Sequence, residues 1–441
     1  MALKTEGHIR AVIELLNEQA DYAVLRNYEG LPDNNKSRDI DIIITKESLR
    51  KIRPVLLQLI EDNGWKIVTY LNSDRLYTYV LSVGDDTKTE LVQWDFFVNT
   101  SVWGVLLMDA PEFLQNKQWN GFLYHVGVAE QFLDKYLYNR AVGAAYPEKY
   151  AETKALAKDL PFVKEKLQRT FDVRTVEDGD AAKGRSLFWR CLKKQIVSRP
   201  LTLLGDISRF LQTFVGNYIH SQTGFSIGFT GPDGAGKTTV IDMMISEMGD
   251  VFRSAHAYYH FRPNLFGNIS DVAHQAGLKK EVDKNYDQPH RGGKTNVASS
   301  LLRLAYYTTD YIIGYFLKVK TKTRITRMVV FDRYYTDIIC DSRRSRIYLS
   351  PQFLYGFSRL FIPSLDYNIL LTASTDTILS RKGELDREGV EAINDRINFL
   401  KDKRGYLVVM NESEPQEAVH EILQYVFKRQ HQKNKKRNGF S

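Results

Sequence analysis

The sequence predicts an α/β protein of two units: a doubly wound, mostly parallel sheet in the C-terminal half and an α+β unit in the N-terminal half. Three observations predict this class. Strand patterns alternate with helical patterns in both halves, which is typical of sheets covered by helices. A glycine-rich loop at residues 231–238 stands between an apolar strand and an amphipathic helix. The chain of 441 residues is also longer than one hydrophobic core usually serves.

The N-terminal unit is expected to span residues 1–165. Apolar periodicity predicts helices over residues 9–17 and 47–62, strands over residues 22–25, 39–44, 65–70, 77–82 and 90–97, and further helices filling residues 111–160. This mixture of strands and helices predicts an α/β unit.

A linker and two amphipathic helices are expected over residues 166–220. The first part is polar and ends in VEDGDAAKGR, a composition typical of linkers. Pro200 divides residues 186–218 into two basic amphipathic helices. These helices either pack as an arm against the C-terminal unit or lie on a membrane surface, since basic residues stand beside Phe188 and Trp189.

The C-terminal unit is expected over residues 221–441. The pattern predicts strands over residues 225–230, 328–331, 367–371 and 406–410, a helix over residues 238–248, and a helical, lid-like segment before the last strand. Strands that alternate with helices in this way predict a mostly parallel, doubly wound sheet.

Composition excludes several classes of protein. With 43% hydrophobic residues the chain can fold as a globular protein, and its two cysteines, Cys191 and Cys340, are too few and too far apart for a disulfide framework or a zinc site. Neither a signal peptide nor a run of about 18 apolar residues occurs, so we expect a soluble, cytoplasmic protein. No sequence-specific nucleic-acid partner is expected. Both a monomer and an oligomer are compatible with the sequence.

The net charge of +8 is concentrated in the tail. Residues 428–437 (KRQHQKNKKR) carry six basic residues and no acid, so the rest of the chain has a net charge of only +2. A run of like charges is usually a solvated, disordered end. The alternative is contact with an anionic membrane surface or a polyanion.

The strongest motif is the glycine-rich loop, which fits the pattern G-x-x-x-x-G-K-[ST]. Backbone N–H groups of such a loop surround phosphate oxygens at a helix N-terminus, the lysine bridges the β- and γ-phosphates of ATP, and the hydroxyl of Thr238 ligates Mg²⁺. The residues expected to hold the nucleotide are Gly231, Asp233, Gly234, Ala235, Gly236, Lys237, Thr238 and Thr239.

Two further segments supply charged side chains. Asp332 and Arg333 end an apolar strand, where an acid can hold Mg²⁺ or its water and an arginine can hold an acceptor phosphate. The segment RKGELDR at residues 381–387 follows a later strand, and its Arg381 and Arg387 can close over the phosphates. Surface charge is the alternative explanation for this segment.

Together these motifs resemble the thymidylate kinase family of nucleoside monophosphate kinases. FTGPDGAGKTT, DRY and GELDR occur in that family's order over about residues 222–430. The resemblance implies a P-loop kinase fold, with Lys237, Asp332, Arg333, Arg381 and Arg387 serving catalysis. It also places Arg262 near the acceptor. Since Ala235 stands where some members carry an arginine, the charge that stabilises the transferring phosphoryl group is expected from the lid.

The acceptor is expected to differ from thymidylate. The stretch that helps to recognise thymine in that family is replaced by YTDIICDSRRSR. Its Arg343, Arg344 and Arg346 suit a more anionic or differently shaped acceptor. This pattern is similar to thymidylate-kinase-like proteins associated with bacterial surface-polysaccharide synthesis, which implies a small-molecule or glycan acceptor.

The N-terminal unit carries three carboxylates on apolar strands. Asp39 and Asp41 stand two residues apart, so both project from one face of a strand, and Asp95 occurs in another strand, LVQWDFF. Two such acids and a third from a neighbouring strand can hold Mg²⁺ and orient a nucleoside triphosphate. Exposed acids or an inactive domain are the alternatives.

This arrangement resembles the nucleotidyltransferase fold of the DNA polymerase β type, over about residues 8–140. The resemblance is closest to a small family that reads LRNYEGLP…DIDI here. The Gly-Ser pair that usually precedes the two acids is replaced by Lys36-Ser37-Arg38. The resemblance implies a metal site of Asp39, Asp41 and Asp95.

These observations predict an ATP- and Mg²⁺-dependent kinase with a nucleotidyltransferase-like partner domain. Two alternatives remain open: a true thymidylate kinase, and a regulatory switch in which bound ATP signals without much turnover. Lid arginines favour an enzyme, because a switch does not need them.

Overall fold

The computed structural model describes residues 3–35, 37, 39–84, 89–220, 223–249, 256–263, 265, 296–324, 328–382, 385–403 and 405–437. The chain divides into two compact units. The N-terminal unit comprises Met1–Asp85, Glu90–Ser221 and Gln430–Ser441, and the C-terminal unit comprises Asp86–Thr89 and Gln222–Arg429.

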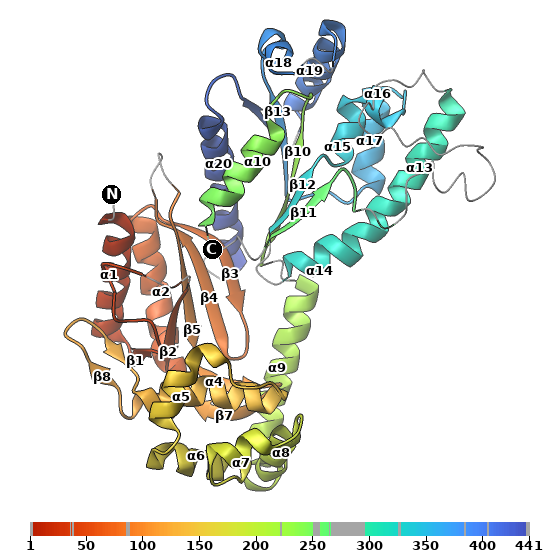
Figure 1. Ribbon diagram of the computed structural model, residues 1–441. Coiled ribbons are helices and arrows are strands. Elements are labelled where there is room, and N and C mark those ends of the chain that lie inside the picture. The colour runs from red at the N-terminus through yellow and green to blue at the C-terminus, as the bar shows by residue number, and fades with distance from the viewer. Residues whose placement is uncertain are drawn as a thin grey trace. The chain divides into compact units, whose positions relative to one another are not determined.

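A mixed seven-stranded sheet forms the centre of the N-terminal unit, in the order β3-β4-β5-β2-β1-β9-β8 (Figure 1). Its strands are β1 (Tyr22–Val24), β2 (Asp39–Ile44), β3 (Lys66–Asn72), β4 (Leu76–Ser82), β5 (Leu91–Phe97), β8 (Gln118–Trp119) and β9 (Tyr124–His125). β2 runs parallel to β5 and antiparallel to β1. The predicted strands are therefore confirmed within one or two residues.

Helices cover both faces of this sheet. On one face α1 (Leu3–Gln19) and α2 (Lys46–Asp62) pack against Ile40, Ile42 and Ile44, because alternate side chains of β2 point to that face. On the other face α4 (Val128–Val142) packs against Ile43. Asp39 and Asp41 share the α4 face with Ile43, since side chains two residues apart in a strand point the same way.

Two hairpins stand outside the predicted pattern. β6 (Asn99–Val102) pairs with β7 (Val105–Asp109), and β8 pairs with β9 inside the segment that was predicted to be entirely helical. That prediction is wrong for residues 118–125. Helices α3 (Ala110–Leu114) and α5 (Ala151–Ala157) and the short turn η1 (Glu148–Tyr150) complete this region.

The stretch predicted as a linker is helical. α6 (Pro161–Phe171) buries Val163, Leu167 and Phe171 in the same core as α4, and α7 (Val176–Ala181) buries Val176 there. α8 (Ser186–Ser198) and α9 (Pro200–His220) follow, divided at Pro200 as predicted. The apolar side chains of α6 recur at helical spacing, and their burial outweighs the polar composition around them.

The basic tail is also helical, where we expected a disordered end. α20 spans Pro415–Arg437, and its last turns, from Gln430, belong to the N-terminal unit. His431 accepts a hydrogen bond from the backbone N–H of Ile67 at 3.1 Å, and Asn434 donates to the carbonyl oxygens of Ile67 and Val68. These contacts hold the end of α20 against β3.

The C-terminal unit contains a parallel five-stranded sheet in the order β11-β12-β10-β13-β14. The strands are β10 (Phe225–Thr230), β11 (His256–His260), β12 (Met328–Asp332), β13 (Tyr367–Thr372) and β14 (Tyr406–Met410). The helical elements are α10 (Lys237–Glu247), α13 (Val297–Gly314), η2 (Tyr315–Val319), α14 (Lys320–Thr323), α15 (Tyr335–Cys340), α16 (Ser342–Ser345), α17 (Pro351–Phe361), α18 (Thr375–Arg381) and α19 (Arg387–Lys401). The predicted parallel, helix-covered sheet is confirmed.

Candidate functional site

The glycine-rich loop lies between the central strand β10 and helix α10, at the carboxyl end of the parallel sheet. Ligands of open α/β sheets bind at this edge. A Cβ atom on Gly231 would collide with the carbonyl oxygen of Leu371, and one on Gly236 would lie 2.5 Å from Nδ2 of Asn411. Gly236 also has a φ of 84°, so the loop needs glycine at both positions for close approach.

Lys237 is buried at the start of α10. Its Nζ donates hydrogen bonds to the carbonyl oxygens of Gly231 at 2.9 Å and Pro232 at 2.8 Å, so the side chain folds back across the loop. Burial and the nearby charge of Arg333 lower the pKa of Lys237 to about 7. A phosphate in the loop would favour the charged ammonium. Thr238 and Thr239 follow in the first turn and are exposed.

Asp332 ends β12 beside the loop strand. Its Oδ2 accepts a hydrogen bond from the hydroxyl of Tyr258 at 3.0 Å and lies 3.4 Å from Nδ1 of His260. Burial opposes ionisation, but the hydrogen bond to His260 and the charges of Lys237 and Arg333 outweigh it and lower the pKa of Asp332. Its Oδ1 is buried and has no hydrogen-bond partner among the described residues.

The unpaired Oδ1 of Asp332 bears on whether this site can bind Mg²⁺. Mg²⁺ prefers one or two carboxylates with water and substrate phosphates. The ionised Asp332, with its free Oδ1, and the exposed hydroxyl of Thr238 supply that donor chemistry. The residues present therefore fit the ion.

Arg333 is held by acids on both sides. Its guanidinium pairs with Asp233 in the loop and with Asp337 on α15, the latter at 2.6 Å. Its φ of 76° lies in the left-handed region, which is uncommon for a residue other than glycine and recurs at functional sites. Asp337 belongs to no motif recognised in the sequence; it is 1% exposed and orients this arginine.

The three arginines expected near the acceptor lie in different surroundings. Arg344 pairs with Asp233 and therefore borders the phosphate loop. Arg343 is 3.2 Å from Asp386, the N-cap of α19, and Arg346 ends α16. The structure thus brings Arg344 to the nucleotide loop and directs Arg343 towards α19.

Arg262 is committed to a buried ion pair. Its Nη1 lies 3.2 Å from Oδ2 of Asp310, a side chain with no exposed area, and its guanidinium lies 4.7 Å from the ring centre of Tyr307. Replacing either member would leave a buried charge. Asp310, 48 residues away in sequence, carried no signal of this pairing.

The arginines expected in the lid lie at the ends of α18 and α19. Arg381 donates to the carbonyl oxygens of Asn411 at 2.7 Å and Glu412 at 2.9 Å, and Arg387 pairs with Asp376. Gly383 and Glu384 of the same segment lie outside the described residues. Lys382 is next to the loop, since its Cβ lies 3.3 Å from the position of a Cβ on Gly234.

Asn411 is a loop contact that the sequence analysis missed. Its Nδ2 donates to the carbonyl oxygen of Ala235 at 2.8 Å, which ties the loop to the end of β14. An asparagine after a short strand carries no recognisable motif. Only the pairing of β13 with β14 brings it to the loop.

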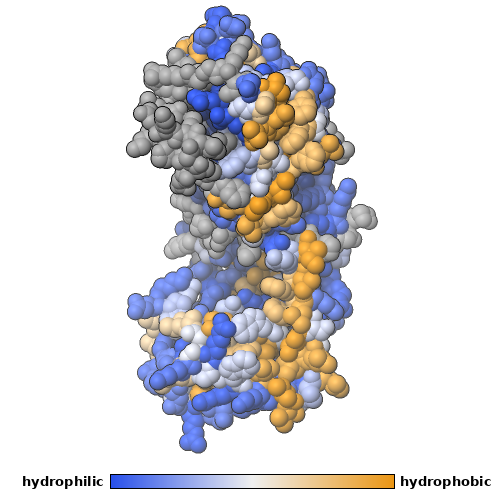
Figure 2. Space-filling model, turned by 90° about the vertical axis from the view of Figure 1, so that its right-hand side faces the viewer, coloured by the Kyte–Doolittle hydropathy of each residue, from blue (hydrophilic) through white to orange (hydrophobic). Residues whose placement is uncertain are grey.

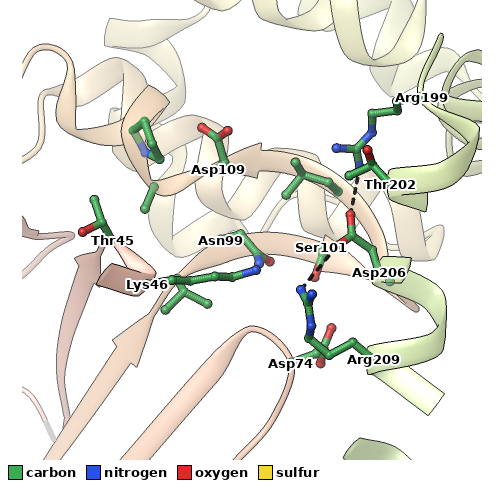
Figure 3. Close-up of a pocket in the computed structure, with 15 residues that line it drawn as sticks. Thr45, Lys46, Asp74, Asn99, Ser101, Asp109, Arg199, Thr202, Asp206 and Arg209 are labelled. Carbon is green, nitrogen blue, oxygen red and sulfur yellow. Dashed lines mark hydrogen bonds and ion pairs between the residues drawn. The ribbon is translucent and has the colours of Figure 1, made fainter. Parts of the chain in front are cut away.

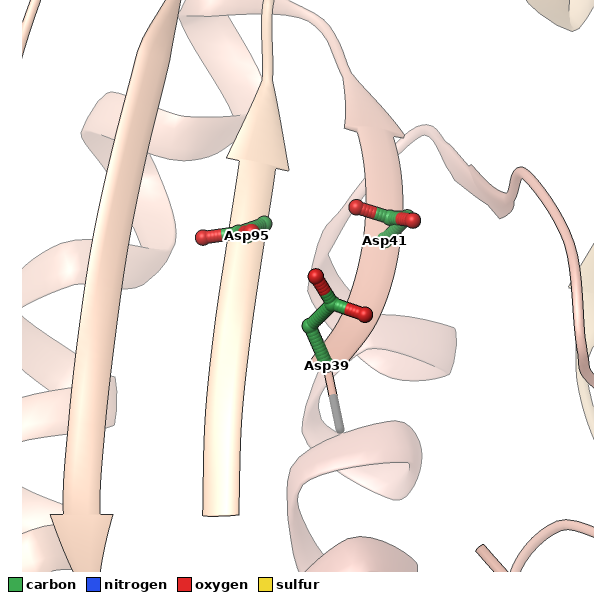
Figure 4. Close-up of side chains that lie close together, drawn as sticks. All are labelled: Asp39, Asp41 and Asp95. Carbon is green, nitrogen blue, oxygen red and sulfur yellow. The ribbon is translucent and has the colours of Figure 1, made fainter. Parts of the chain in front are cut away.

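The three carboxylates of the N-terminal unit converge, as predicted. Asp41 on β2 stands opposite Asp95 on β5 in the parallel register, and Asp39 precedes them on the same face. One ligand oxygen from each of the three lies within 4.8 Å of the others. Figure 4 shows the three side chains on the two neighbouring strands. Carboxylate oxygens at this spacing suit a divalent cation such as Mg²⁺.

The electrostatics of the cluster favour a cation. Burial raises the pKa of Asp41, and burial and the charge of Asp41 raise that of Asp95 to about 6, against the hydrogen bond that Asp95 accepts from Thr78 at 2.5 Å. Like charges held together in a buried site repel one another unless a cation neutralises them. Arg26 supplies one positive charge, with Nε 2.6 Å from Oδ2 of Asp41.

Arg26 also connects the cluster to α4. Its Nη1 is 3.0 Å from Oδ2 of Asp134, which in turn accepts a hydrogen bond from Thr100 at 2.9 Å. Ser37 donates to Oδ1 of Asp39 at 3.1 Å, so this residue of the altered Gly-Ser position still contacts the cluster. Lys36 and Arg38 lie outside the described residues.

A cavity lies at the carboxyl end of the β2–β5 pair, beyond the carboxylates. It has a volume of 330 Å³, and apolar side chains such as Val98 and Leu106 line it together with charged ones (Figure 3). Thr45 lies four residues after Asp41, and Asn99 lies four residues after Asp95. On its α9 side Asp206 lies 3.3 Å from Arg199 and 3.5 Å from Arg209. At about 3.3 Å per strand residue, roughly 13 Å separate the cavity from the carboxylates, so the two are distinct.

Comparisons with known proteins give likenesses to solved structures alone. No protein-family model and no curated protein matches the sequence. Among solved structures, the chain is similar to a thymidylate kinase from Ehrlichia chaffeensis, with 16% identity and a TM-score of 0.32. The match covers 46% of this chain and 98% of that one.

Proposed function

We propose that the C-terminal unit is an ATP-dependent phosphotransferase. The observation that supports it is the conjunction of Lys237 folded across a glycine loop, an ionised Asp332 with a free oxygen, and two guanidinium groups, Arg333 and Arg344, at Asp233. A regulatory nucleotide site would need the loop but not this concentration of positive charge. Phosphoryl transfer depends on such positioned charge.

In the proposed reaction an acceptor oxygen attacks the γ-phosphorus of ATP. The new P–O bond forms as the bond to the β-phosphate oxygen breaks, and ADP leaves. A hydroxyl acceptor loses its proton to solvent or base, whereas a phosphate acceptor has none to lose. Lys237 binds the β- and γ-phosphates, and Arg333 and Arg344 neutralise the charge of the phosphoryl group. Mg²⁺, held through Asp332 and Thr238, would supply further charge neutralisation when bound.

We propose a sugar hydroxyl or an anionic glycan as the acceptor, in surface-polysaccharide synthesis. Support comes from the arginine-rich YTDIICDSRRSR stretch in place of a thymine-recognising one. Thymidylate kinase activity and an ATP-dependent switch are the competing functions. On this proposal dTMP is a poor acceptor. Saturable dTDP formation that outpaces every sugar and glycan acceptor would instead establish the thymidylate kinase.

The test is transfer from radiolabelled ATP to nucleoside monophosphates, sugars and glycan extracts. Lys237→Ala should abolish transfer while the circular dichroism spectrum stays unchanged. Lys401→Ala, which removes an exposed lysine of α19, is the matched control and should transfer normally. Full turnover in Lys237→Ala would refute the kinase, and nucleotide binding without transfer to any acceptor would favour the switch.

We also propose nucleotidyl transfer for the N-terminal unit, supported by the convergence of Asp39, Asp41 and Asp95. In that reaction an acceptor hydroxyl attacks the α-phosphorus of a nucleoside triphosphate and loses its proton to solvent. The bond from the α-phosphorus to the bridging oxygen breaks, and pyrophosphate leaves. Binding of Mn²⁺, followed by its electron paramagnetic resonance signal, tests the site without requiring turnover. Asp39→Asn should weaken Mn²⁺ binding, and Asp33→Asn, at an exposed acid nearby in sequence, should not. Equal binding by both variants would leave this unit without the proposed metal site.

A further inference from the structure

Helices α8 and α9 carry an exposed apolar surface that neither proposed reaction uses. Ten large hydrophobic side chains are between 48% and 85% exposed there. We call them the α8–α9 face: Trp189, Ile196, Val197, Leu201, Leu204, Leu211, Phe214, Val215, Tyr218 and Ile219. Exposed apolar patches of this extent mark interaction sites.

The face is one side of an amphipathic pair of helices. α8 buries Leu187, Phe188 and Cys191 in the core and turns Trp189 and Ile196 outward. Among the described side chains of α9 only Leu203 is buried, and the exposed apolar residues are three, four or seven positions apart, which places them on one side of the helix. Both helices lie on the right-hand side of Figure 1, and Figure 2, which faces that side, shows a hydrophobic band in its lower half.

Positive charge surrounds this face. Residues 186–219 contain five basic residues and one acid, Asp206, which is itself paired with Arg199. Beside α8 a cleft of 740 Å³ is lined by the cations of Lys166, Arg169, Lys193, Lys194 and Arg199. Two acids also line this cleft, Asp109 and Glu112, and Glu112 is paired with Lys166 and Arg169, so the five cations are in excess.

The combination of positive charge and apolar surface on the α8–α9 face indicates which kind of partner it can bind. A second copy of the chain on the same face would place basic clusters opposite each other, which is unfavourable. An anionic bilayer accepts both features, because apolar side chains enter the acyl boundary while lysines and arginines meet lipid phosphates. None of the helices in the described part of the chain has the length and apolar content of a bilayer span.

We propose that the α8–α9 face binds the surface of a membrane that contains anionic phospholipids. The inference goes beyond both proposed reactions and does not depend on them. Val197 and Leu201, the most exposed members at 85% and 84%, insert among the acyl chains. Lys193, which is exposed, binds a headgroup phosphate, and Lys194 exchanges its contact with Asp172, at 3.6 Å, for another.

The experiment is co-sedimentation of the full chain with vesicles of phosphatidylcholine, with and without phosphatidylglycerol. Wild type should bind the anionic vesicles and should bind the neutral ones at least about tenfold more weakly. Lys193→Gln with Lys194→Gln should weaken binding roughly 30-fold, since each cation near an anionic surface contributes to affinity. Arg50→Gln with Lys51→Gln, an adjacent exposed pair on α2, is the charge control and should bind as wild type.

The apolar half is tested by Val197→Ser with Leu201→Ser, which should reduce binding at least about tenfold. The control is Leu156→Ser, which removes a leucine that is 63% exposed on α5 and should leave vesicle binding unchanged. Circular dichroism of each variant shows whether it folds. Equal binding to neutral and anionic vesicles, or unchanged binding by the serine variant, overturns the proposal. The proposal is also overturned if the wild type does not bind vesicles but forms dimers, and the serine variant does not dimerise. That result would assign the α8–α9 face to contact with a second copy of the chain.

Discussion

Single side chains determine how charge is distributed at the phosphate loop. Arg344 was predicted to meet the acceptor, but it pairs with Asp233 of the loop, 111 residues earlier in the chain. Arg343, its neighbour, points to Asp386. Arg344 therefore lies at the nucleotide loop, whereas Arg343 lies at the start of α19.

Arg344→Ala should reduce kcat by about 100-fold or more, because a positioned cation at the transferring phosphoryl group would be lost. Arg343→Ala keeps the loop contacts and should change kcat much less. Steady-state kinetics with ATP and the best acceptor measure both variants. Equal losses would mean that Arg344 does not act at the loop.

A buried histidine sets the acid sensitivity of the N-terminal unit. His8 on α1 is 1% exposed, and its Nε2 accepts a hydrogen bond from Nε1 of Trp94 at 2.9 Å. Burial lowers the pKa of His8 from 6.5 to about 3. Between pH 6.5 and about pH 3, His8 binds a proton in the unfolded chain but not in the folded one. The free energy of unfolding therefore falls as the pH falls below 6.5.

The free energy of unfolding should therefore drop by about 2 kcal/mol between pH 6.5 and pH 5 through His8 alone, at 1.4 kcal/mol per pH unit. His8→Gln keeps an acceptor for Trp94 and should lose this pH dependence. Tryptophan fluorescence during urea unfolding reports this unit alone, because all five tryptophans lie in it. Parallel pH profiles for wild type and variant would rule out His8 as the cause.

At the scale of elements, the end of α20 completes the edge of a sheet. β3 is the first strand of its sheet, and its pairing with β4 is irregular between Ile67 and Thr69. A bulge leaves backbone groups unpaired. Side chains of His431 and Asn434 bond to those groups, which also covers an edge that would otherwise be open to other strands.

Asn434→Ala should destabilise the N-terminal unit by about 1–3 kcal/mol, because two buried carbonyl oxygens lose their donor. Deletion of the chain from Gln430 onward should cost more. Lys436→Ala, on the exposed side of the same turn, is the control and should be neutral within about 0.5 kcal/mol. Unfolding followed by tryptophan fluorescence gives these values. An unchanged melting temperature after the deletion would indicate that the tail contributes nothing to this unit.

At the scale of the whole molecule, each unit has a group of charged side chains of its own among the described residues. The carboxylate cluster draws Asp39, Asp41 and Asp95 from one sheet, and the phosphate loop draws its contacts from the other. Neither set includes a residue of the other unit. The two proposed chemistries should therefore be separable by mutation.

Asp39→Asn should remove metal binding by the N-terminal unit and leave transfer from ATP by the C-terminal unit unchanged. Lys237→Ala should do the reverse. Both are measured on the full chain, with Mn²⁺ titration for the first site and radiolabel transfer for the second. Loss of phosphoryl transfer in Asp39→Asn would show that the two units act as one catalytic assembly.

The sequence alone determined what local patterns encode. Apolar periodicity located the strands that carry Asp39, Asp95 and Asp332, and the glycine spacing identified the loop at Lys237, because these signals depend on neighbours a few residues apart. Only the tertiary structure decided which distant groups meet. The pairing of Arg344 with Asp233, of Arg262 with Asp310 and of Asn434 with β3 depends on strand order and helix packing. Ion pairs and hydrogen bonds across more than 40 residues leave no periodicity in the chain, so no local pattern can report them.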